Sequence, residues 1–280
     1  MYIAYFAKSI ANPISLLYNQ SMSIEFKNEL NYKDAWFAYL KGSSSRRGNE
    51  IHPYHEIIYF LRVKGKILCE QFEAELCDNS LLVIPANTYH QVVIDDQEGY
   101  TRLLMNFGDI DGLTDMPTLG SGKNKYIPRL SEDIAFLLKK IIDNLKDADD
   151  IKARLIFGAF MMLLSEIESA EFLSLSQRVG DERGMLKRCL DHIDENFGAK
   201  LSAANIARAV GISESSLYSL FKKNLGISLH RYITEKRIMY AHTKIKEGAL
   251  PTKIYAECGY NDYATFYKAY VKLLGKAPSG

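Results

Sequence analysis

The chain has 280 residues, of which 47% are hydrophobic and 25% are charged, as is typical of a globular protein. This length accommodates two domains, each with its own core. The net charge of +1 hides an uneven distribution, because residues 185–280 contain 15 Lys and Arg against 8 Asp and Glu, whereas residues 1–184 contain 20 against 26. The basic C-terminal part therefore has a polyanion as its natural partner.

Cysteine spacing and hydropathy indicate the compartment. The four cysteines show no CxxC spacing, so neither a zinc site of that type nor a redox motif is indicated. The chain opens without a basic and then apolar leader, which favours reduced thiols over a disulfide between Cys69 and Cys77. No apolar run reaches the length of about 18 residues that a membrane span needs. We expect a cytoplasmic protein without a membrane partner.

Short apolar segments separated by polar turns characterise the N-terminal part. Residues 24–27 and 35–40 indicate strands, and residues 41–48 indicate an exposed loop. Further strand patterns follow at residues 57–61, 67–77, 81–84, 91–94 and 102–107. This succession predicts an antiparallel sheet that is closed or sandwiched.

Two histidine-containing segments lie among these strands, namely His52-Pro53-Tyr54-His55-Glu56 and Pro85-Ala86-Asn87-Thr88-Tyr89-His90. This part of the chain resembles the cupin-type β-barrel, and the two segments stand at the positions of its two motifs. The resemblance implies an N-terminal barrel that senses a small molecule. We expect the effector to contact His55, Tyr59 and His90.

A metal-binding barrel is the alternative interpretation of these histidines. Cupin enzymes space two histidines so that strand alternation turns both to one face of the sheet. Here the pair is His52-x-x-His55, which a regular strand would turn to opposite faces, and no carboxylate follows at the expected spacing. We therefore expect no metal and no other cofactor. Since no nucleophile and base stand out either, we expect no catalysis.

Two helical patterns follow the strands. Residues 131–145 begin at Ser131-Glu132-Asp133, whose acidic side chains suit a helix N-terminus. Residues 151–167 indicate a second helix, which is too apolar to have only one buried face. The two helices either pack on the sheet or form a contact between subunits. Residues 174–184 are polar and weakly periodic, which predicts a linker between domains.

One pattern occurs twice in residues 203–275. In each copy a short apolar helix reaches a glycine, and a second helix begins after an N-capping Ser213 or Asp262. Each copy therefore predicts a helix-turn-helix. Residues 228–246 join the copies as a helix of about 28 Å. A rigid rod of this length would hold two recognition helices in successive major grooves, which lie about 34 Å apart.

These C-terminal residues resemble the DNA-binding domain of AraC/XylS-type transcription regulators. The resemblance rests on Gly211-Ile212-Ser213, Leu217, Phe221-Lys222-Lys223, Gly226-x-Ser228, Tyr232-Ile233 with Arg237, and Gly259-Tyr260. It implies an α+β protein of two domains. Residues 1–173 are the cupin-like antiparallel β-barrel with its helical dimerisation segment, residues 174–184 the linker, and residues 185–280 an all-α domain with two helix-turn-helix units.

The resemblance also implies the function. We expect a sequence-specific, double-stranded-DNA-binding transcription regulator that is controlled by an unidentified small-molecule effector in the barrel. Its expected state is a homodimer, and RNA polymerase is a further candidate partner. Two alternatives stay open: a metal-dependent cupin enzyme fused to a DNA-binding module, and a constitutive DNA-binding protein whose barrel is only structural.

The expected DNA contacts lie on the second helix of each unit. By resemblance, Ser215, Tyr218 and Ser219 occupy base-reading positions in the first unit, while Lys222 and Lys223 suit phosphates. The exposed residues expected in the second unit are Tyr263, Ala264, Tyr267 and Lys268. Of these, the lysine could meet guanine O6 and N7. The alternative for the tyrosines is that they only cover apolar surface.

Overall fold

The computed structural model describes residues 24–42, 49–70, 72–94, 99–108, 110, 125–169, 181–198 and 201–279. Most of the predicted loop at residues 41–48 and most of the predicted linker at residues 174–184 lie outside these ranges. Among the described helices, none combines the length and the apolar character that crossing a membrane requires.

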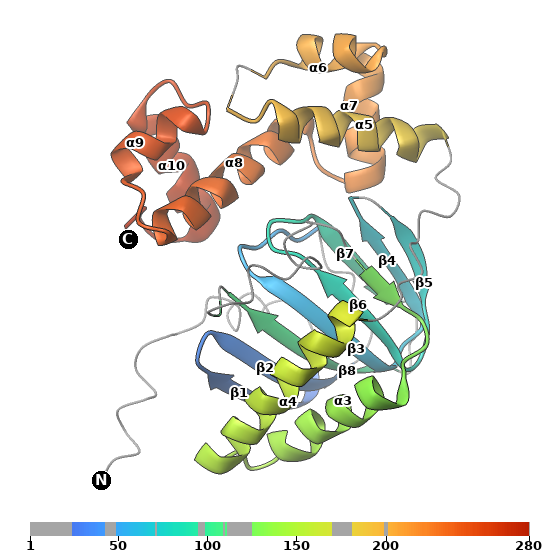
Figure 1. The fold of residues 1–280 in the computed structure, drawn as a ribbon. Helices are drawn as coiled ribbons and strands as arrows, with labels where there is room; N and C mark the ends of the chain where they lie inside the picture. Colours follow the sequence, from blue (N-terminus) through green and yellow to red (C-terminus); the bar gives the residue numbers. More distant parts are fainter. Residues whose placement is uncertain are drawn as a thin grey trace.

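The described N-terminal strands form two antiparallel sheets (Figure 1). The larger sheet has the order β1-β2-β8-β3-β6-β9 and the smaller the order β5-β4-β7. The strand bounds are β1 (Ile24–Tyr32), β2 (Ala35–Gly42), β3 (His55–Arg62), β4 (Gly65–Cys69), β5 (Glu73–Leu76), β6 (Ser80–Ile84), β7 (His90–Ile94), β8 (Tyr100–Phe107) and β9 (Lys125–Ile127). Most predicted strands are confirmed with bounds that differ by a few residues, but the pattern at residues 67–77 forms two strands, β4 and β5, and β9 was not predicted.

The two sheets share one apolar core. Trp36, Ile58 and Phe60 of the larger sheet pack in the same buried cluster as Ile67 and Val92 of the smaller sheet. The described strands thus pair as two sheets over a common core, and they do not show the predicted closed barrel. The reason is that β5, β4 and β7 form a ladder with one another and none with the larger sheet.

Two helices cover the opposite face of the larger sheet, as Figure 1 shows. They are α3 (Glu132–Leu145) and α4 (Asp150–Ser169), and α3 begins at the predicted Ser131, whose Oγ accepts a hydrogen bond from the Ile134 N–H. Phe160 of α4 meets Phe37 of β2 edge to face at 5.2 Å between ring centroids. Because side chains alternate along a strand, β3 turns odd-numbered residues to these helices and even-numbered ones between the sheets.

The C-terminal part is helical. Its elements are α5 (Asp181–Glu195), α6 (Ala203–Val210), α7 (Glu214–Leu225), α8 (Leu229–Lys246), α9 (Pro251–Glu257) and α10 (Tyr263–Leu274). The pairs α6–α7 and α9–α10 are the two predicted helix-turn-helix units, and α8 runs from one to the other (Figure 1). Helix α5 already begins inside the range predicted as linker, and it packs in the core of the first unit. The cysteines are free thiols, so Cys69 and Cys77 form no disulfide.

Candidate nucleic-acid interface and a buried polar cluster

The turns of both helix-turn-helix units have the geometry that their sequence predicts. Gly211 and Gly259 adopt left-handed backbone angles, with φ of 79° and 74°, which glycine reaches without a steric penalty. The Ser213 side chain accepts a hydrogen bond from the Ser216 N–H, and that of Asp262 accepts one from the Thr265 N–H. Both recognition helices therefore begin where the N-caps predict.

The first recognition helix, α7, separates its apolar and polar side chains. Leu217, Leu220 and Phe221 are buried. The predicted DNA contacts are all exposed, namely Ser215, Tyr218, Ser219, Lys222 and Lys223. Three of them line a shallow hollow on this face together with Met185 of α5, namely Ser215, Ser219 and Lys223. The structure thus brings the predicted residues of this helix together on one accessible surface.

The second recognition helix, α10, shows the same division with one difference. Phe266 is fully buried, while Ala264, Tyr267 and Lys268 are exposed. Tyr263 is half-buried, and its ring lies 5.9 Å from that of Phe266. Part of Tyr263 therefore covers the core of its unit, whereas Tyr267 presents its ring to the surface.

The structure does not gather the three residues predicted to contact an effector. His55 and Tyr59 lie on the face of β3 that α3 and α4 cover, where the His55 ring stacks on Phe107 at 5.3 Å. His55 Nδ1 accepts a hydrogen bond from the Ala86 N–H at 3.2 Å, and burial lowers its pKa to about 4. His90 lies on the opposite side, between the sheets.

A buried polar cluster surrounds His90. Its Nε2 lies 3.1 Å from Oε2 of Glu56, and Nε2 of His52 lies 3.5 Å from the same oxygen. All three side chains are almost fully buried. Although burial by itself would raise it, the pKa of Glu56 is held well below its ordinary value by His52 and His90. The pKa of His90 is raised, because contact with Glu56 outweighs the lowering effect of burial.

Sequence reasoning did not anticipate Glu56 as the partner of these histidines. The expectation of opposite faces assumed that His52 and His55 lie on one regular strand, but β3 begins only at His55, and the search for a carboxylate followed the cupin spacing. His52 precedes the strand, so alternation does not control its direction. The available signal was Glu56 itself, a charged residue at the start of the otherwise apolar run of β3, next to a histidine.

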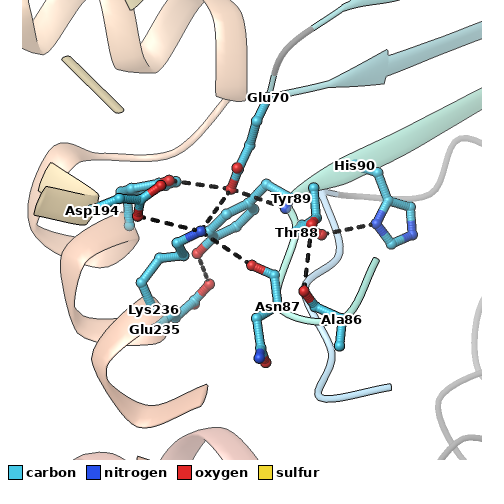
Figure 2. A network of polar contacts seen from close by, with 10 residues as sticks. Glu70, Ala86, Asn87, Thr88, Tyr89, His90, Asp194, Glu235 and Lys236 are labelled. Atoms are coloured by element: carbon cyan, nitrogen blue, oxygen red, sulfur yellow. Dashed lines mark hydrogen bonds and ion pairs between the residues drawn. The ribbon is translucent and has the colours of Figure 1, made fainter. Parts of the chain in front are cut away.

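The chain segment next to His90 connects the sheets to the C-terminal helices (Figure 2). The Tyr89 N–H donates to Glu70 Oε1 at 3.1 Å, and the Tyr89 hydroxyl donates to Glu235 of α8. The Tyr232 hydroxyl of α8 donates to the same Glu70 oxygen at 3.2 Å, and its ring stacks on Tyr89 at 5.1 Å. Two aromatic rings and two carboxylates thus join regions that lie far apart in sequence.

Lys236 completes this contact. Its Nζ donates to the backbone oxygen of Asn87 at 3.3 Å and lies 3.6 Å from Glu70 and 3.7 Å from Asp194. Burial raises the pKa of Glu70, and the nearby Lys236 ammonium opposes that rise. No sequence pattern predicts the pairs that join α8 to the N-terminal region, because their members are more than 140 residues apart.

Comparison with known proteins identifies the C-terminal helices as a helix-turn-helix domain. A family model described as a helix-turn-helix domain matches residues 206–280. The probable transcriptional regulator LumQ of Photobacterium leiognathi is 24% identical over 229 residues, which cover 81% of this chain and 89% of LumQ. The Msm operon regulatory protein of Streptococcus mutans is 21% identical over 236 residues, covering 83% of this chain and 85% of that protein.

Among solved structures, the AraC-like transcriptional activator CuxR is 17% identical and covers 78% of this chain and 80% of its own, with a TM-score of 0.42. The C-terminal region is therefore a helix-turn-helix domain, and the relatives that match most of the chain are themselves regulators, as the resemblance to AraC/XylS-type transcription regulators implied.

Proposed function

We propose that this DNA-binding transcription regulator contacts its operator through the exposed faces of α7 and α10. The observation that carries the proposal is that both helices bury their apolar residues and expose the polar ones at the predicted contact positions. Helix α8 has 18 residues and so spans about 27 Å between the units. This length suits two neighbouring major-groove segments, which are about 34 Å apart from centre to centre.

The two helices differ in the contacts that we assign to them. In α7, Ser215, Tyr218 and Ser219 are assigned to bases, and Lys222 and Lys223 to phosphates. In α10, Ala264, Tyr267 and Lys268 are assigned to bases. Tyr263 contributes less to DNA contact, because its ring is half-buried. Bases specify the sequence and phosphates position the protein.

The salt dependence of binding tests the phosphate contacts. Each phosphate that a lysine neutralises contributes about −0.9 to the slope of log affinity against log salt. Changing Lys222 and Lys223 together to Ala should therefore make this slope shallower by about 2. Fluorescence anisotropy with duplex DNA measures it, and Lys139→Ala on the remote helix α3 is the control. A slope that is equal in the double variant and the control contradicts the assignment.

A homodimer is supported by an uncovered apolar face on α3 and α4. Four large hydrophobic side chains are more than half exposed there, namely Phe136, Ile151, Leu155 and Met162. The three on α4 lie at spacings that place them along one side of the helix, and Gly158 between them leaves room for close approach. We assign this face to the same face of a second copy, because soluble oligomers are most often symmetric pairs.

Sedimentation equilibrium tests the dimer. Changing Leu155 and Met162 together to Glu should convert dimers to monomers, because the charges would be buried without partners. Thr252→Glu, an exposed change on α9, is the control. If the wild-type chain is monomeric at concentrations in the micromolar range and above, this part of the proposal is wrong.

Effector control completes the proposal, and it separates a regulated protein from one with a purely structural N-terminal region. His90 is the predicted residue with a direct route to the DNA-binding helices, through the neighbouring Tyr89. Replacing His90 with Ala should therefore alter the response of DNA affinity to an effector more than His55→Ala does. Members of this family are regulators rather than enzymes, so the enzyme alternative has no support. DNA as the partner and free cysteines both favour a cytoplasmic location.

A further inference from the structure

We propose that His52, Glu56 and His90 bind one first-row divalent cation of the Zn²⁺ class, and that this cation steadies residues 87–90 against the DNA-binding helices. The three residues offer two imidazole nitrogens and one carboxylate oxygen, which is a donor set that such ions accept. The ligand atoms all lie within 4.8 Å of one another.

The distances suit a shared ion. Two ligands that are each about 2.0–2.1 Å from a tetrahedral zinc ion lie about 3.4 Å apart. The observed separations from Glu56 Oε2 are 3.1 Å to His90 Nε2 and 3.5 Å to His52 Nε2. Both separations are close to the spacing that two ligands of one ion adopt, and all three ligand atoms lie within 4.8 Å of one another.

The tautomers of the two histidines also favour metal binding. His52 Nδ1 lies 2.9 Å from the backbone oxygen of Tyr54, and His90 Nδ1 lies 3.1 Å from that of Thr88. A carbonyl oxygen only accepts, so each Nδ1 must carry the proton and donate it. In the neutral ring, Nε2 then holds a lone pair, which is the arrangement found in histidines that bind metals through Nε2.

Both lone pairs converge on a carboxylate in a buried site. Both Nε2 atoms face the same Glu56 oxygen, and the two histidine side chains are only 7% and 2% exposed. Two lone pairs beside a negative charge repel one another unless a positive charge lies between them. That charge is either a bound cation or a proton on a ring, and the two cases give different results on titration with metal.

Asn106 adds an oxygen donor at the edge of the cluster. It is the partner of Glu56 in the β3–β8 register, so both side chains project from the same face of the sheet. The Asn106 amide is 1% exposed, and among the described residues neither its oxygen nor its nitrogen has a hydrogen-bond partner. An amide oxygen can bind a cation directly or through water.

The site is continuous with the contact between the two regions. His90 is preceded by Thr88, which holds its ring, and by Tyr89, which binds Glu235 and stacks on Tyr232 of α8. Figure 2 shows this continuity from His90 to Lys236. An ion that holds the His90 ring therefore restrains the segment that docks on α8. This coupling rests on the proposed function, whereas metal binding does not.

Metal binding is tested on the full chain. Protein stripped with EDTA and desalted is titrated with ZnCl₂ by calorimetry, and the zinc retained after dialysis is counted by mass spectrometry. We expect one Zn²⁺ per chain and a higher melting temperature, because the ion binds only the folded form. Absence of stoichiometric binding by the wild-type chain overturns the proposal, and it shows that a proton alone occupies the cluster.

Variants locate the ion. His52→Gln, Glu56→Gln and His90→Gln should each weaken binding at least about 100-fold, since even changes behind metal ligands cost about 10- to 100-fold. The controls are His55→Gln, next to the cluster but on the other face, and His230→Gln at an exposed position of α8; both should keep wild-type affinity. Circular dichroism shows which variants are folded. Zinc affinity that survives in folded Glu56→Gln, or that disappears in a control, assigns the ion to another site and overturns the proposal.

The coupling is measured separately. Zinc should change the affinity of the wild-type chain for operator DNA, but not that of Tyr89→Ala, measured at a zinc concentration that saturates both proteins by calorimetry. If Tyr89→Ala responds to zinc as the wild type does, the route through Tyr89 is wrong. If neither the wild type nor the variant binds DNA while zinc still binds, the proposed function fails and the metal site stands.

Discussion

The two helix-turn-helix units follow one pattern but differ in what surrounds them. The core of the first unit contains Tyr89 from the N-terminal region beside Leu217 and Phe221. In the described structure, the core of the second unit, with Phe266 and Tyr270, takes its residues only from α8 onward. A change in the N-terminal region can therefore reach the first unit by direct contact, while it reaches the second through α8.

The buried polar groups differ in the same way. In the first unit, Tyr232 and Glu235 of α8 bind Tyr89 and Glu70 of the N-terminal region. In the second unit, His242 of α8 binds Tyr270 of α10, with 2.6 Å between Nδ1 and the hydroxyl. The first network connects its unit to the N-terminal region, whereas the second connects helices within one unit. The first unit is thus the place where regulation can act, and the second is a self-contained module.

The largest expected effect comes from breaking the shared core. Tyr89→Ala removes a buried ring and the donor to Glu235, and loss of a large buried aromatic side chain costs about 3–5 kcal/mol. We expect the two regions to unfold in separate transitions. Fluorescence of the single Trp36 reports the N-terminal region, and circular dichroism at the helical band reports the C-terminal helices. Coincident transitions in the variant would show that Tyr89 does not join the regions.

Substitution of the turn glycines allows a direct comparison of the two units. Gly211→Ala places a methyl group in open space. It should lower the free energy of unfolding only by the penalty of a left-handed backbone, about 1–2 kcal/mol. Gly259→Ala should also displace Arg237, which donates to the Gly259 oxygen, and a hydrogen bond from a charged donor is worth about 1.5–3 kcal/mol. Urea unfolding measures both variants. An equal loss of unfolding free energy would show that Arg237 moves aside freely.

Substitutions on the two recognition helices should change DNA binding in different ways. Lys268→Ala should reduce discrimination between operator and random DNA, since a good base contact is worth about 1–3 kcal/mol. Lys223→Ala should lower the affinity for both DNAs together, because a phosphate contact does not depend on sequence. Each variant is measured on both DNAs at one salt concentration. Unchanged discrimination in Lys268→Ala would remove this residue from base recognition.

The stability of the second unit should also depend on pH. Burial, with the nearby Lys276 and Lys246, lowers the pKa of His242 to about 4 from its ordinary 6.5. Between pH 6.5 and pH 4, His242 is protonated in the unfolded chain but neutral in the folded unit. The unfolding free energy therefore falls as pH drops through this range. The slope approaches about 1.4 kcal/mol per pH unit. His242→Gln should show a shallower slope in urea unfolding between pH 7 and 5, and an equal slope would exclude His242 as its source.

Much of the fold could be predicted because local signals agree with the structure. Ser131, Ser213 and Asp262 cap helices where they were expected to, and Gly211 and Gly259 form the expected turns. Capping and left-handed turns involve residues only a few positions apart, so the sequence shows them directly. The exposed faces of α7 and α10 followed from the spacing of apolar residues for the same reason.

The cluster at His90 and its contact with α8 could not be predicted in this way. His52, Glu56 and His90 meet because one residue precedes β3, one lies on it and one begins β7, and Tyr89 meets Glu235 across 146 positions. Helices, turns and alternating strands can be predicted from local patterns, since they depend on neighbours along the chain. The sheet face of each histidine and the helix-turn-helix unit that the N-terminal region contacts depend on packing between distant segments, so they appear only in the folded chain.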